Sequence, residues 1–437
     1  MPHRSHPDVL VAGAGPAGSA VAVGLARLGF TVWVLSVPRP FAAIEGVSAR
    51  VREGLRHAGL PRAADAIPSP TPRTAHWGGE RREANTESLV ERAALDAALR
   101  ADLDAAGIRV LSLRLRSVRR TTGGGVEAGV GDGQQISAAL LVDARGRSSF
   151  ARRACAMRGP DSLALVQRWR GPSCEPGSQV LSIAGGWLWL ARLADGTRYT
   201  QLSTAADAPG LPARAGLSAW LQKTIEAEPE ARSWVEGSVP RGRPVARAST
   251  AWLHAAPCAD AVLRVGDAAM AVDPLSGNGI FQALSSASVA PAVINSLLND
   301  PVNAALALGF YRERLYEIFL RFARIGRDFH ASETRFGQEA FWLPRAAWPD
   351  AIPAHAGERR VSAIARRAVV EEGWIREREL AITPEQPLGV WRVAGMEIVP
   401  WLRMPLPERG IRLAALDDAF TRAALGTWLR AHGELPD

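Results

Sequence analysis

Residues 264–279 read Arg-Val-Gly-Asp-Ala-Ala-Met-Ala-Val-Asp-Pro-Leu-Ser-Gly-Asn-Gly, and this stretch decides the fold more than any other. An apolar run over 262–265 has the pattern of a strand end, and it delivers the Gly-Asp pair. Gly266 would let the backbone come close to a bulky ligand, because it has no Cβ. Asp267 can accept hydrogen bonds from ligand hydroxyls. The stretch therefore predicts a strand edge that binds a large hydroxylated ligand.

The second half of the stretch predicts a loop that faces the same ligand. Pro274 begins the loop, and a helical pattern follows from Ile280. The two glycines before that helix would aim backbone N–H groups and a helix N-terminus at an electron-rich edge of the ligand. The residues concerned are Gly277, Asn278 and Gly279.

A second glycine motif, Gly13-Ala14-Gly15-Pro16-Ala17-Gly18, lies near the start of the chain. Residues 8–12 have a buried-strand pattern, 18–29 have helical periodicity, and 30–35 predict a second strand. The motif thus occupies the strand-to-helix turn of a βαβ unit, where amides and the helix dipole hold a pyrophosphate. The two glycine-rich segments together predict the two halves of an FAD site. Candidate cofactor contacts from this turn are Gly13, Gly15, Ala17 and Gly18.

The second strand of the βαβ unit ends at Ser36, where an acidic residue would ordinarily bind a ribose. Ser36 is still a candidate to bond one ribose hydroxyl, and Arg39 could bind a phosphate instead. The choice of FAD over a nicotinamide cofactor therefore depends on the other segments.

The charge of the chain comes almost entirely from arginine. The net charge is +8 and the pI about 10.4, yet Lys223 is the only lysine and no basic run occurs. Arginine-biased codon usage explains this pattern most simply, and a patch for an acidic protein or an anionic cofactor is the alternative. We expect no nucleic-acid partner.

Cysteine spacing and apolar runs limit the class of protein. Cys155, Cys174 and Cys258 form no C-x-x-C pair, so we expect neither a disulfide framework nor a metal site. The first strand begins within eight residues of Met1, which leaves no room for a signal peptide. We also expect no apolar run long enough to cross a membrane, and hence a cytoplasmic enzyme without a membrane partner.

Composition shifts along the chain predict three domains. The FAD domain is expected in two parts, over 1–160 and over 251–345 with long helices broken near Pro291 and at Asp300-Pro301. Residues 161–250 alternate as in an antiparallel substrate-binding sheet, and 350–437 form a small C-terminal domain.

Helix signals are also present between the two glycine motifs. Ser88-Leu89-Val90-Glu91 fits a capping box, which predicts a helix from there to about Ala106.

A third segment, Leu141-Val142-Asp143-Ala144-Arg145-Gly146-Arg147-Ser148, completes the set of motifs on which a family resemblance rests. With Arg92 and the Gly266-Asp267 pair, it resembles the large superfamily of FAD-dependent monooxygenases and halogenases over roughly residues 8–345. The resemblance implies an α/β, glutathione-reductase-like FAD fold. It also implies that Arg92 and Asp143 contact the cofactor, that Asp267 binds the ribityl chain, and that Pro274–Gly279 lies beside the reactive ring. Glu45, Pro274 and Gly277 are the candidate catalytic residues.

Two further segments are similar to tryptophan halogenases. Glu45-Gly46-Val47-Ser48 resembles their flavin-loop segment, and Gly186-Trp187-Leu188-Trp189-Leu190 resembles their Trp-x-Trp signature. Trp187 and Trp189 are thus candidates for a substrate pocket, although two same-face strand residues packed in the core would give the same pattern. Halogenation needs a positioned lysine, and Lys223 lies in a predicted helix far from the glycine motif. We therefore do not expect a halogenase.

A last resemblance concerns the substrate. The segments Phe329–Phe336 and Phe341–Arg345 are similar to the region after the FAD domain in flavoprotein maturases that hydroxylate a tryptophan in the precursor of a peptide-derived quinone cofactor. The alternative is an aromatic helix packed on the FAD domain.

These resemblances imply a monooxygenase in which a flavin C4a-hydroperoxide hydroxylates a tryptophan of a small protein. They also imply that the same tryptophan is hydroxylated twice. O2 is then the cosubstrate, NAD(P)H or reduced flavin the electron source, and other maturation proteins candidate partners. A base would assist the second hydroxylation, and His76, Glu45 and Asp273 are its candidates. Two alternatives stay open: an FAD-dependent hydroxylase or reductase of a free indole or prenyl compound, and a flavin-binding maturation chaperone without turnover.

Overall fold

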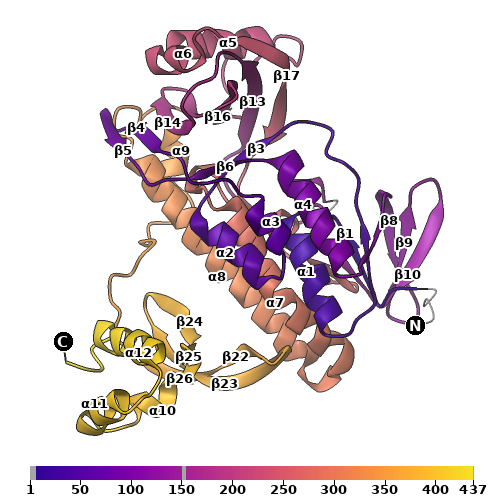
Figure 1. Ribbon diagram of the computed structural model, residues 1–437, viewed down its shortest axis with the longest axis vertical. Helices are drawn as coiled ribbons and strands as arrows, with labels where there is room; N and C mark the ends of the chain where they lie inside the picture. The colour runs from indigo at the N-terminus through magenta and orange to yellow at the C-terminus, as the bar shows by residue number, and fades with distance from the viewer. Residues whose placement is uncertain (1–5, 150–153, 437) are drawn as a thin grey trace. The chain divides into compact units, whose positions relative to one another are not determined.

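The computed structural model describes residues 6–149 and 154–436 and confirms the expected mixed α/β fold (Figure 1). The chain forms two compact units. The first comprises Met1–Pro291 with Phe322–Ala351, and the second comprises Ala292–Arg321 with Ile352–Asp437. The expected division into an FAD domain, a substrate-binding sheet and a C-terminal domain is finer than these two units, and it stays a prediction.

A six-stranded sheet carries the cofactor motifs. Its central strands pair in parallel and are buried along almost their whole length, as expected for a sheet covered on both faces. Helices α1 (Pro16–Arg27) and α4 (Arg92–Ala105) belong to this layer, and α2 (Ala49–His57) and α3 (Pro61–Asp65) precede α4. In spatial order the strands are β19 (Cys258–Ala259), β20 (Val262–Arg264), β11 (Leu140–Asp143), β1 (Val9–Ala12), β2 (Val32–Leu35) and β7 (Arg109–Leu111).

The predicted capping box was wrong. Ser88–Glu91 forms strand β6, which pairs antiparallel with β3 (Ile44–Val47), and helix α4 begins only at Arg92. The Glu91 carboxylate accepts the Tyr199 hydroxyl at 2.9 Å, so it does not return to the backbone of Ser88. Strand pairing and burial of the apolar side chains override the local helix signal here.

A small antiparallel sheet lies beside the edge of the six-stranded sheet and shares its core. It contains a hairpin that turns at Asp132-Gly133, and its apolar residues pack against Leu10, Leu35 and Leu141. Its strands are β8 (Leu115–Arg120), β9 (Val126–Val130) and β10 (Gln134–Ala138).

A seven-stranded sheet follows the order β17-β13-β16-β15-β14-β4-β5 and is antiparallel except for the β14–β4 pair. Helices α5 (Leu217–Ala227) and α6 (Pro229–Val235) cover one face of it (Figure 1) and share its apolar core. Its strands are β4 (Arg73–Trp77), β5 (Glu80–Glu83), β13 (Ser162–Arg170), β14 (Gly177–Ile183), β15 (Gly186–Arg192), β16 (Thr197–Ala205) and β17 (Val239–Ala248). A three-stranded sheet joins β12 (Cys155–Arg158), β18 (Trp252–His254) and β21 (Met270–Ala271).

Two long helices follow the glycine loop: α7 (Gly279–Asn299) and α8 (Ala304–Ala331). The expected break at Asp300-Pro301 is confirmed, because a 3-10 turn separates the helices there. The expected break near Pro291 was wrong, since α7 runs through it. The Pro291 ring packs against Gly24 of α1, where a Cβ would lie 2.6 Å from it.

Helix α7 also corrects the expectation about apolar runs. By length and composition it could cross a membrane, but 72% of its most apolar window is buried inside the structure. Core helices of globular proteins meet the same criteria, so the helix is weak evidence for a membrane span.

The second unit has a core of its own. Ala381, Ile398 and Trp401 are fully buried in it together with leucines of its two longest C-terminal helices. Its elements are β22 (Ala363–Glu371), β23 (Trp374–Thr383), β24 (Gln386–Val390), β25 (Arg392–Val393), β26 (Met396–Glu397), α10 (Ile398–Leu402), α11 (Leu406–Ala414) and α12 (Ala419–Ala431).

Candidate cofactor site and active site

The three cofactor motifs lie at the same edge of the six-stranded sheet. The N-terminal glycines follow β1, Asp143 ends β11, and Gly266 follows β20 after one residue. These strands are neighbours and run parallel, so their carboxyl ends meet. Ligands of open α/β sheets bind outside those ends. The fold therefore brings the motifs together as predicted from sequence.

The N-terminal glycines divide into two kinds. A Cβ on Gly18 would lie 1.9 Å from the carbonyl oxygen of Gly13 and 3.0 Å from the Ala144 Cβ. One on Gly13, whose φ is +114°, would lie 2.5 Å from the Ala144 carbonyl oxygen. By contrast, a Cβ on Gly15 would meet nothing within 4 Å. Gly13 and Gly18 thus permit close backbone packing, while Gly15 leaves open space at the N-terminus of α1.

Gly266 joins the two halves of the site. Its φ is +57°, and a Cβ there would lie 3.1 Å from the Ala17 Cβ of α1 and 3.3 Å from the Ala283 Cβ of α7. Its N–H donates to the Ser286 hydroxyl at 2.8 Å. Only a glycine lets the end of β20 approach both helices so closely.

Charged side chains from separate elements meet beside this edge. Arg147 of the third motif lies 3.3 Å from Asp267, and Arg92 of α4 lies 3.5 Å from Glu45 of β3. The Arg92 guanidinium also bonds Asp96 at 2.9 Å, while its Nε has no hydrogen-bond partner among the described residues. The structure thus brings together Glu45, Arg92 and Asp267, which the resemblance assigns to the cofactor site.

Glu45 and Asp267 are both enclosed by protein and partly accessible. Removal from bulk water raises the pKa of both carboxyls, and neighbouring arginines offset this only in part. Yet 43% of the Glu45 side chain and 35% of the Asp267 side chain remain accessible. Groups that are surrounded by protein and still accessible face an interior space, as cofactor-binding groups do.

Asp143 and Ser36 are placed differently. Asp143 is buried, and its carboxylate is occupied by Arg145 at 2.7 Å and by the Ser149 hydroxyl at 2.6 Å. Burial alone would raise the pKa of Asp143, but these hydrogen bonds and the Arg145 charge outweigh it and lower the pKa. Asp143 thus organises the turn after β11. Ser36 directly follows β2, and its N–H donates to the Leu111 carbonyl of β7 at 2.9 Å.

The loop before α7 presents backbone to the same region. The Asp273 carboxylate accepts the Leu275 N–H at 2.9 Å and fixes the short turn that begins at Pro274. Gly277 ends that turn with a φ of +62°, and a Cβ on Gly277 or on Gly279 would meet nothing within 4 Å. Asn278 N–H donates to the Ser276 hydroxyl at 3.4 Å. The loop thus leaves an open backbone surface at the N-terminus of α7.

These features fit FAD. Open backbone at the start of α1 suits a pyrophosphate, Asp267 suits the ribityl hydroxyls, and the open glycine loop suits the edge of the ring. When bound there, FAD would supply the redox chemistry, which is activation of O2 by the reduced ring. Arg92 and Asp267 would hold and orient it.

The two candidate pocket tryptophans lie in the protein core. Trp187 is 3% exposed and Trp189 is 9% exposed, in an aromatic cluster that includes Leu275 of the glycine loop. The Trp189 indole N–H donates to the buried Glu87 carboxylate at 3.0 Å. Little of either indole is left for a substrate, so their role in substrate binding stays a prediction.

The aromatic segment after α8 packs on the same cluster. Trp342 is fully buried, lies 5.2 Å from Trp77 between ring centroids, and donates its N–H to the Ile183 carbonyl at 3.0 Å. Helix α9 (Trp342–Ala347) carries it. The segment therefore closes the sheet face nearest the glycine loop.

Glu333 connects the aromatic segment to the seven-stranded sheet through hydrogen bonds. Its buried carboxylate accepts hydrogen bonds from the Gly78 N–H at 2.7 Å, from the Ser182 hydroxyl and from Arg335 at 3.0 Å. Burial would raise the pKa of Glu333, but these bonds lower it to about 2. Sequence reasoning missed this residue, because an acidic residue after a helix looks like an ordinary surface group.

We expect Glu333→Gln to destabilise the protein by a few kcal/mol at pH 7, since buried donors lose a charged acceptor. A carboxyl with a folded pKa near 2 and an ordinary unfolded pKa stabilises the fold above about pH 4.5, and this contribution fades as the pH falls toward 2. Thermal unfolding of both proteins at pH 7 and pH 3 measures it. The gap in melting temperature should narrow at pH 3, and an equal gap would contradict the assignment.

The three candidate bases occupy different settings. Glu45 lies beside Arg92 and is partly accessible, whereas His76 on β4 lies 3.8 Å from Glu230. Asp273 begins the glycine loop and lies 4.0 Å from the buried His330. His330 lies within the Phe329–Phe336 segment, and the sequence alone indicates no role for it. Its spacing from Phe319, Ala323 and Gly326 on one helix face was the available signal.

Fold and site together define an FAD-dependent oxidoreductase. The profile of the tryptophan halogenase family matches residues 88–374, more than half of the chain. The chain belongs to this family.

Comparison with solved structures gives a further likeness. The structure titled peptidyl tryptophan dihydroxylase QhpG, essential for tryptophylquinone cofactor biogenesis, is 41% identical, with a TM-score of 0.84 over 98% of this chain and 100% of that one. The flavin-dependent halogenase CmlS is 17% identical with a TM-score of 0.73 over 99% of this chain and 93% of that one, which shows the shared fold.

Curated relatives include two classes of enzyme. The tryptophan 2-halogenase of Chondromyces crocatus is 26% identical over 77% of this chain and 70% of its own length. The digeranylgeranylglycerophospholipid reductase 1 of Methanopyrus kandleri is 29% identical over 71% of this chain and 86% of its own length.

Proposed function

We propose that this protein is an FAD-dependent monooxygenase that hydroxylates a tryptophan side chain in a precursor protein, during maturation of a tryptophylquinone-type cofactor. The observation that carries the proposal is the 41% identity to a peptidyl tryptophan dihydroxylase along almost the whole of both chains. The second unit is included in that match, whereas the tryptophan 2-halogenase covers 77% of this chain.

The site supports oxygen transfer to an aromatic ring. An indole is itself nucleophilic, so the protein must mainly bind the cofactor, orient the ring and exclude water. The cofactor edge supplies Arg92 and Asp267, and the aromatic cluster beside Leu275 supplies an apolar wall. Two hydroxylations of one ring would also require loss of protons from the substrate, which a base assists.

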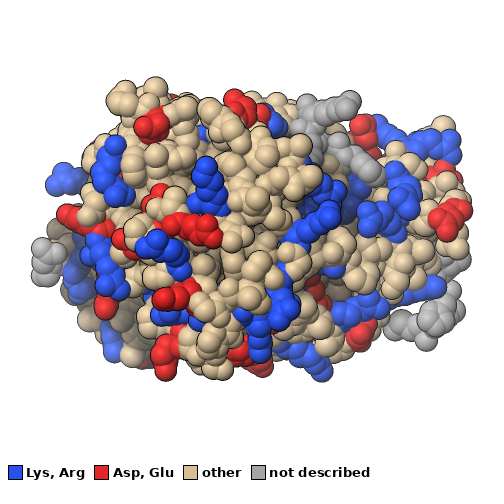
Figure 2. All heavy atoms as spheres, turned by 90° about the horizontal axis from the view of Figure 1, so that it is seen from above, with Lys and Arg blue, Asp and Glu red and all other residues tan. Residues whose placement is uncertain are grey.

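A protein substrate also suits the surface. Basic side chains are spread over the whole face seen in Figure 2, with acidic ones among them, and the net charge of the chain is +8. Such a distribution favours approach of an acidic precursor without requiring one dominant patch.

We expect no halogenation, although the family is named for it. Lys223, the only lysine, lies on the exposed side of α5, which covers the seven-stranded sheet on the face where the α5–α6 core packs. No other lysine amine exists to position hypohalous acid. Reaction with the precursor in chloride or bromide should give only oxygenated product by mass spectrometry, and the same product without halide. Halogenated product would overturn the assignment.

The proposal is tested against its rivals by comparing substrates. With a reductant and O2, the enzyme should consume O2 with a precursor that carries the tryptophan, and the precursor should gain oxygen atoms. Free tryptophan or indole oxidised at a comparable rate would favour the small-molecule enzyme. A prenyl lipid reduced without uptake of O2 would favour the reductase class. Bound flavin with no turnover on any of these would favour the chaperone.

A further inference from the structure

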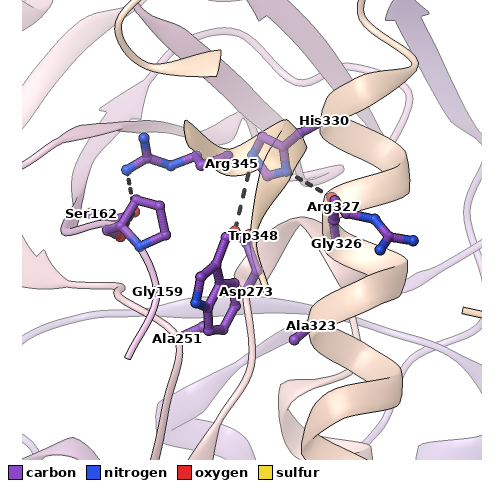
Figure 3. Close-up of a pocket in the computed structure, with 11 residues that line it drawn as sticks. Gly159, Ser162, Ala251, Asp273, Ala323, Gly326, Arg327, His330, Arg345 and Trp348 are labelled. Carbon is purple, nitrogen blue, oxygen red and sulfur yellow. Dashed lines mark hydrogen bonds and ion pairs between the residues drawn. The ribbon is translucent and has the colours of Figure 1, made fainter. Parts of the chain in front are cut away.

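A small cavity lies behind the Asp273–Gly277 loop (Figure 3). It has room of about 20 Å3, which is enough for one water molecule. Polar groups from separate elements line it: Asp273 before α7, His330 on α8, and Ser162 and Arg345 on the opposite wall. Such a small space, with polar groups in part of its lining, can hold an ordered water.

His330 presents a lone pair to this region. The side chain is 2% exposed, and its Nδ1 lies 2.8 Å from the Gly326 carbonyl oxygen. Because a carbonyl oxygen can only accept a hydrogen bond, Nδ1 must carry the proton. In the neutral ring Nε2 is then an acceptor. Nε2 has no hydrogen-bond partner among the described residues, and the Asp273 carboxylate lies 4.0 Å away.

Two acceptors that face each other require a proton donor between them. The 4.0 Å separation of His330 and Asp273 is too long for a direct hydrogen bond. A water that donates one O–H to each would satisfy both groups, and the cavity has room for it. The alternative is a proton on Nε2, which turns the contact into an ion pair.

Burial is the main reason that His330 is neutral near pH 7, because it lowers the pKa of the imidazole. The Asp273 charge and the Gly326 hydrogen bond oppose this effect, and the Arg345 charge reinforces it. Arg345 is itself buried and committed to the Phe341 carbonyl at 2.7 Å and to Ser162. Arg327, which also lines the cavity, is committed to Asp328 and to the Asp350 carbonyl. Asp273 is thus the anion that faces the imidazole.

The pair is joined directly to the glycine loop. Besides accepting the Leu275 N–H, Asp273 accepts the Ser276 hydroxyl through its carbonyl oxygen at 2.8 Å. His330 also contacts the aromatic cluster, with ring centroids 5.6 Å from Trp342. The imidazole therefore borders both the cavity and the aromatic wall of the candidate active site.

We propose that Asp273 and His330 are a proton-accepting pair that acts through one bound water behind the glycine loop. The inference rests on the proposed function, in which the indole N–H or a new ring hydroxyl must lose a proton. That O–H or N–H bond breaks, an Nε2–H bond forms on His330 through the water, and Asp273 stabilises the imidazolium. The proton then returns to solvent, and no oxidant or reductant takes part.

Side-chain nitrogen NMR of the flavin-bound protein tests the pair independently of turnover. We expect a neutral Nδ1–H imidazole that titrates below pH 6.5 and whose signals disappear in His330→Gln. Asp273→Asn should move this titration to still lower pH, because it removes the facing negative charge. An Nε2–H tautomer, or a titration unchanged by Asp273→Asn, would overturn the proposal.

The pH profile of precursor hydroxylation adds a kinetic test. We expect kcat in His330→Gln to fall at least tenfold at pH 7, with loss of the acid limb and with KM for the precursor within about twofold. His432→Gln is the matched control, because His432 is also buried, at the C-terminal end of α12, and its Nδ1 lies 2.6 Å from the Trp428 carbonyl four residues earlier. Equal pH profiles for the two variants would refute the role. If the wild-type enzyme leaves the precursor unmodified, the proposed function fails and the NMR result alone decides on the pair.

Discussion

Gly18→Ala is expected to abolish FAD binding by disrupting the fold itself. The new Cβ would lie 1.9 Å from the carbonyl oxygen of Gly13, so β1 and α1 could not keep their present approach. Backbone atoms cannot move away as a flexible side chain can, and we expect a loss of about 3 kcal/mol or more in stability. Thermal unfolding of the flavin-free protein measures it.

Gly15→Ala is the control that separates packing from ligand binding. Its Cβ would meet nothing within 4 Å and its φ of −75° suits alanine, so the flavin-free protein should unfold at the wild-type temperature. FAD affinity should nevertheless fall, because the Cβ would occupy the open space proposed for the pyrophosphate. Equal loss of stability in both variants, or wild-type affinity in Gly15→Ala, would contradict this division of roles.

Asp267→Ala is expected to weaken FAD binding by about 10- to 100-fold. A hydrogen bond from a ligand hydroxyl to a carboxylate contributes on the order of 1.5–3 kcal/mol, and alanine cannot replace it. Asp267→Asn keeps one acceptor and should lie between the two. Flavin fluorescence titration gives the dissociation constants.

The control for Asp267 is Asp65→Ala, which removes an exposed aspartate whose ion pair, within the described part of the chain, is with Arg56 on the surface. It should retain wild-type flavin content. Undiminished FAD affinity in Asp267→Ala would show that the carboxylate serves only Arg147, its partner in the structure.

Much of the cofactor site could be predicted from sequence because its signals are local. The glycines, the Gly-Asp pair and the Asp143 turn each follow a short apolar strand, and the carboxyl ends of parallel strands meet by the rules of the fold. The roles of individual glycines could not be separated in this way. Gly15 and Gly18 belong to one motif, yet one faces open space and the other a backbone oxygen.

Signals that depend on distant partners were missed or misjudged. Ser88–Glu91 satisfies a capping pattern, but strand pairing with residues more than forty positions earlier decides its conformation. Glu333 and His330 gain their properties from Ser182 and Asp273, which no local pattern connects to them. Buried titratable groups of this kind require the tertiary structure.

The central claim is that the enzyme adds oxygen from O2 to a tryptophan held in a protein. The most direct test is the intact mass of the tryptophan-bearing precursor before and after reaction under isotopically heavy O2, with peptide mapping of the product. We predict gain of heavy oxygen atoms at a single tryptophan, and none when that tryptophan is replaced by phenylalanine. A precursor of unchanged mass, or oxygen derived from water, would contradict the account.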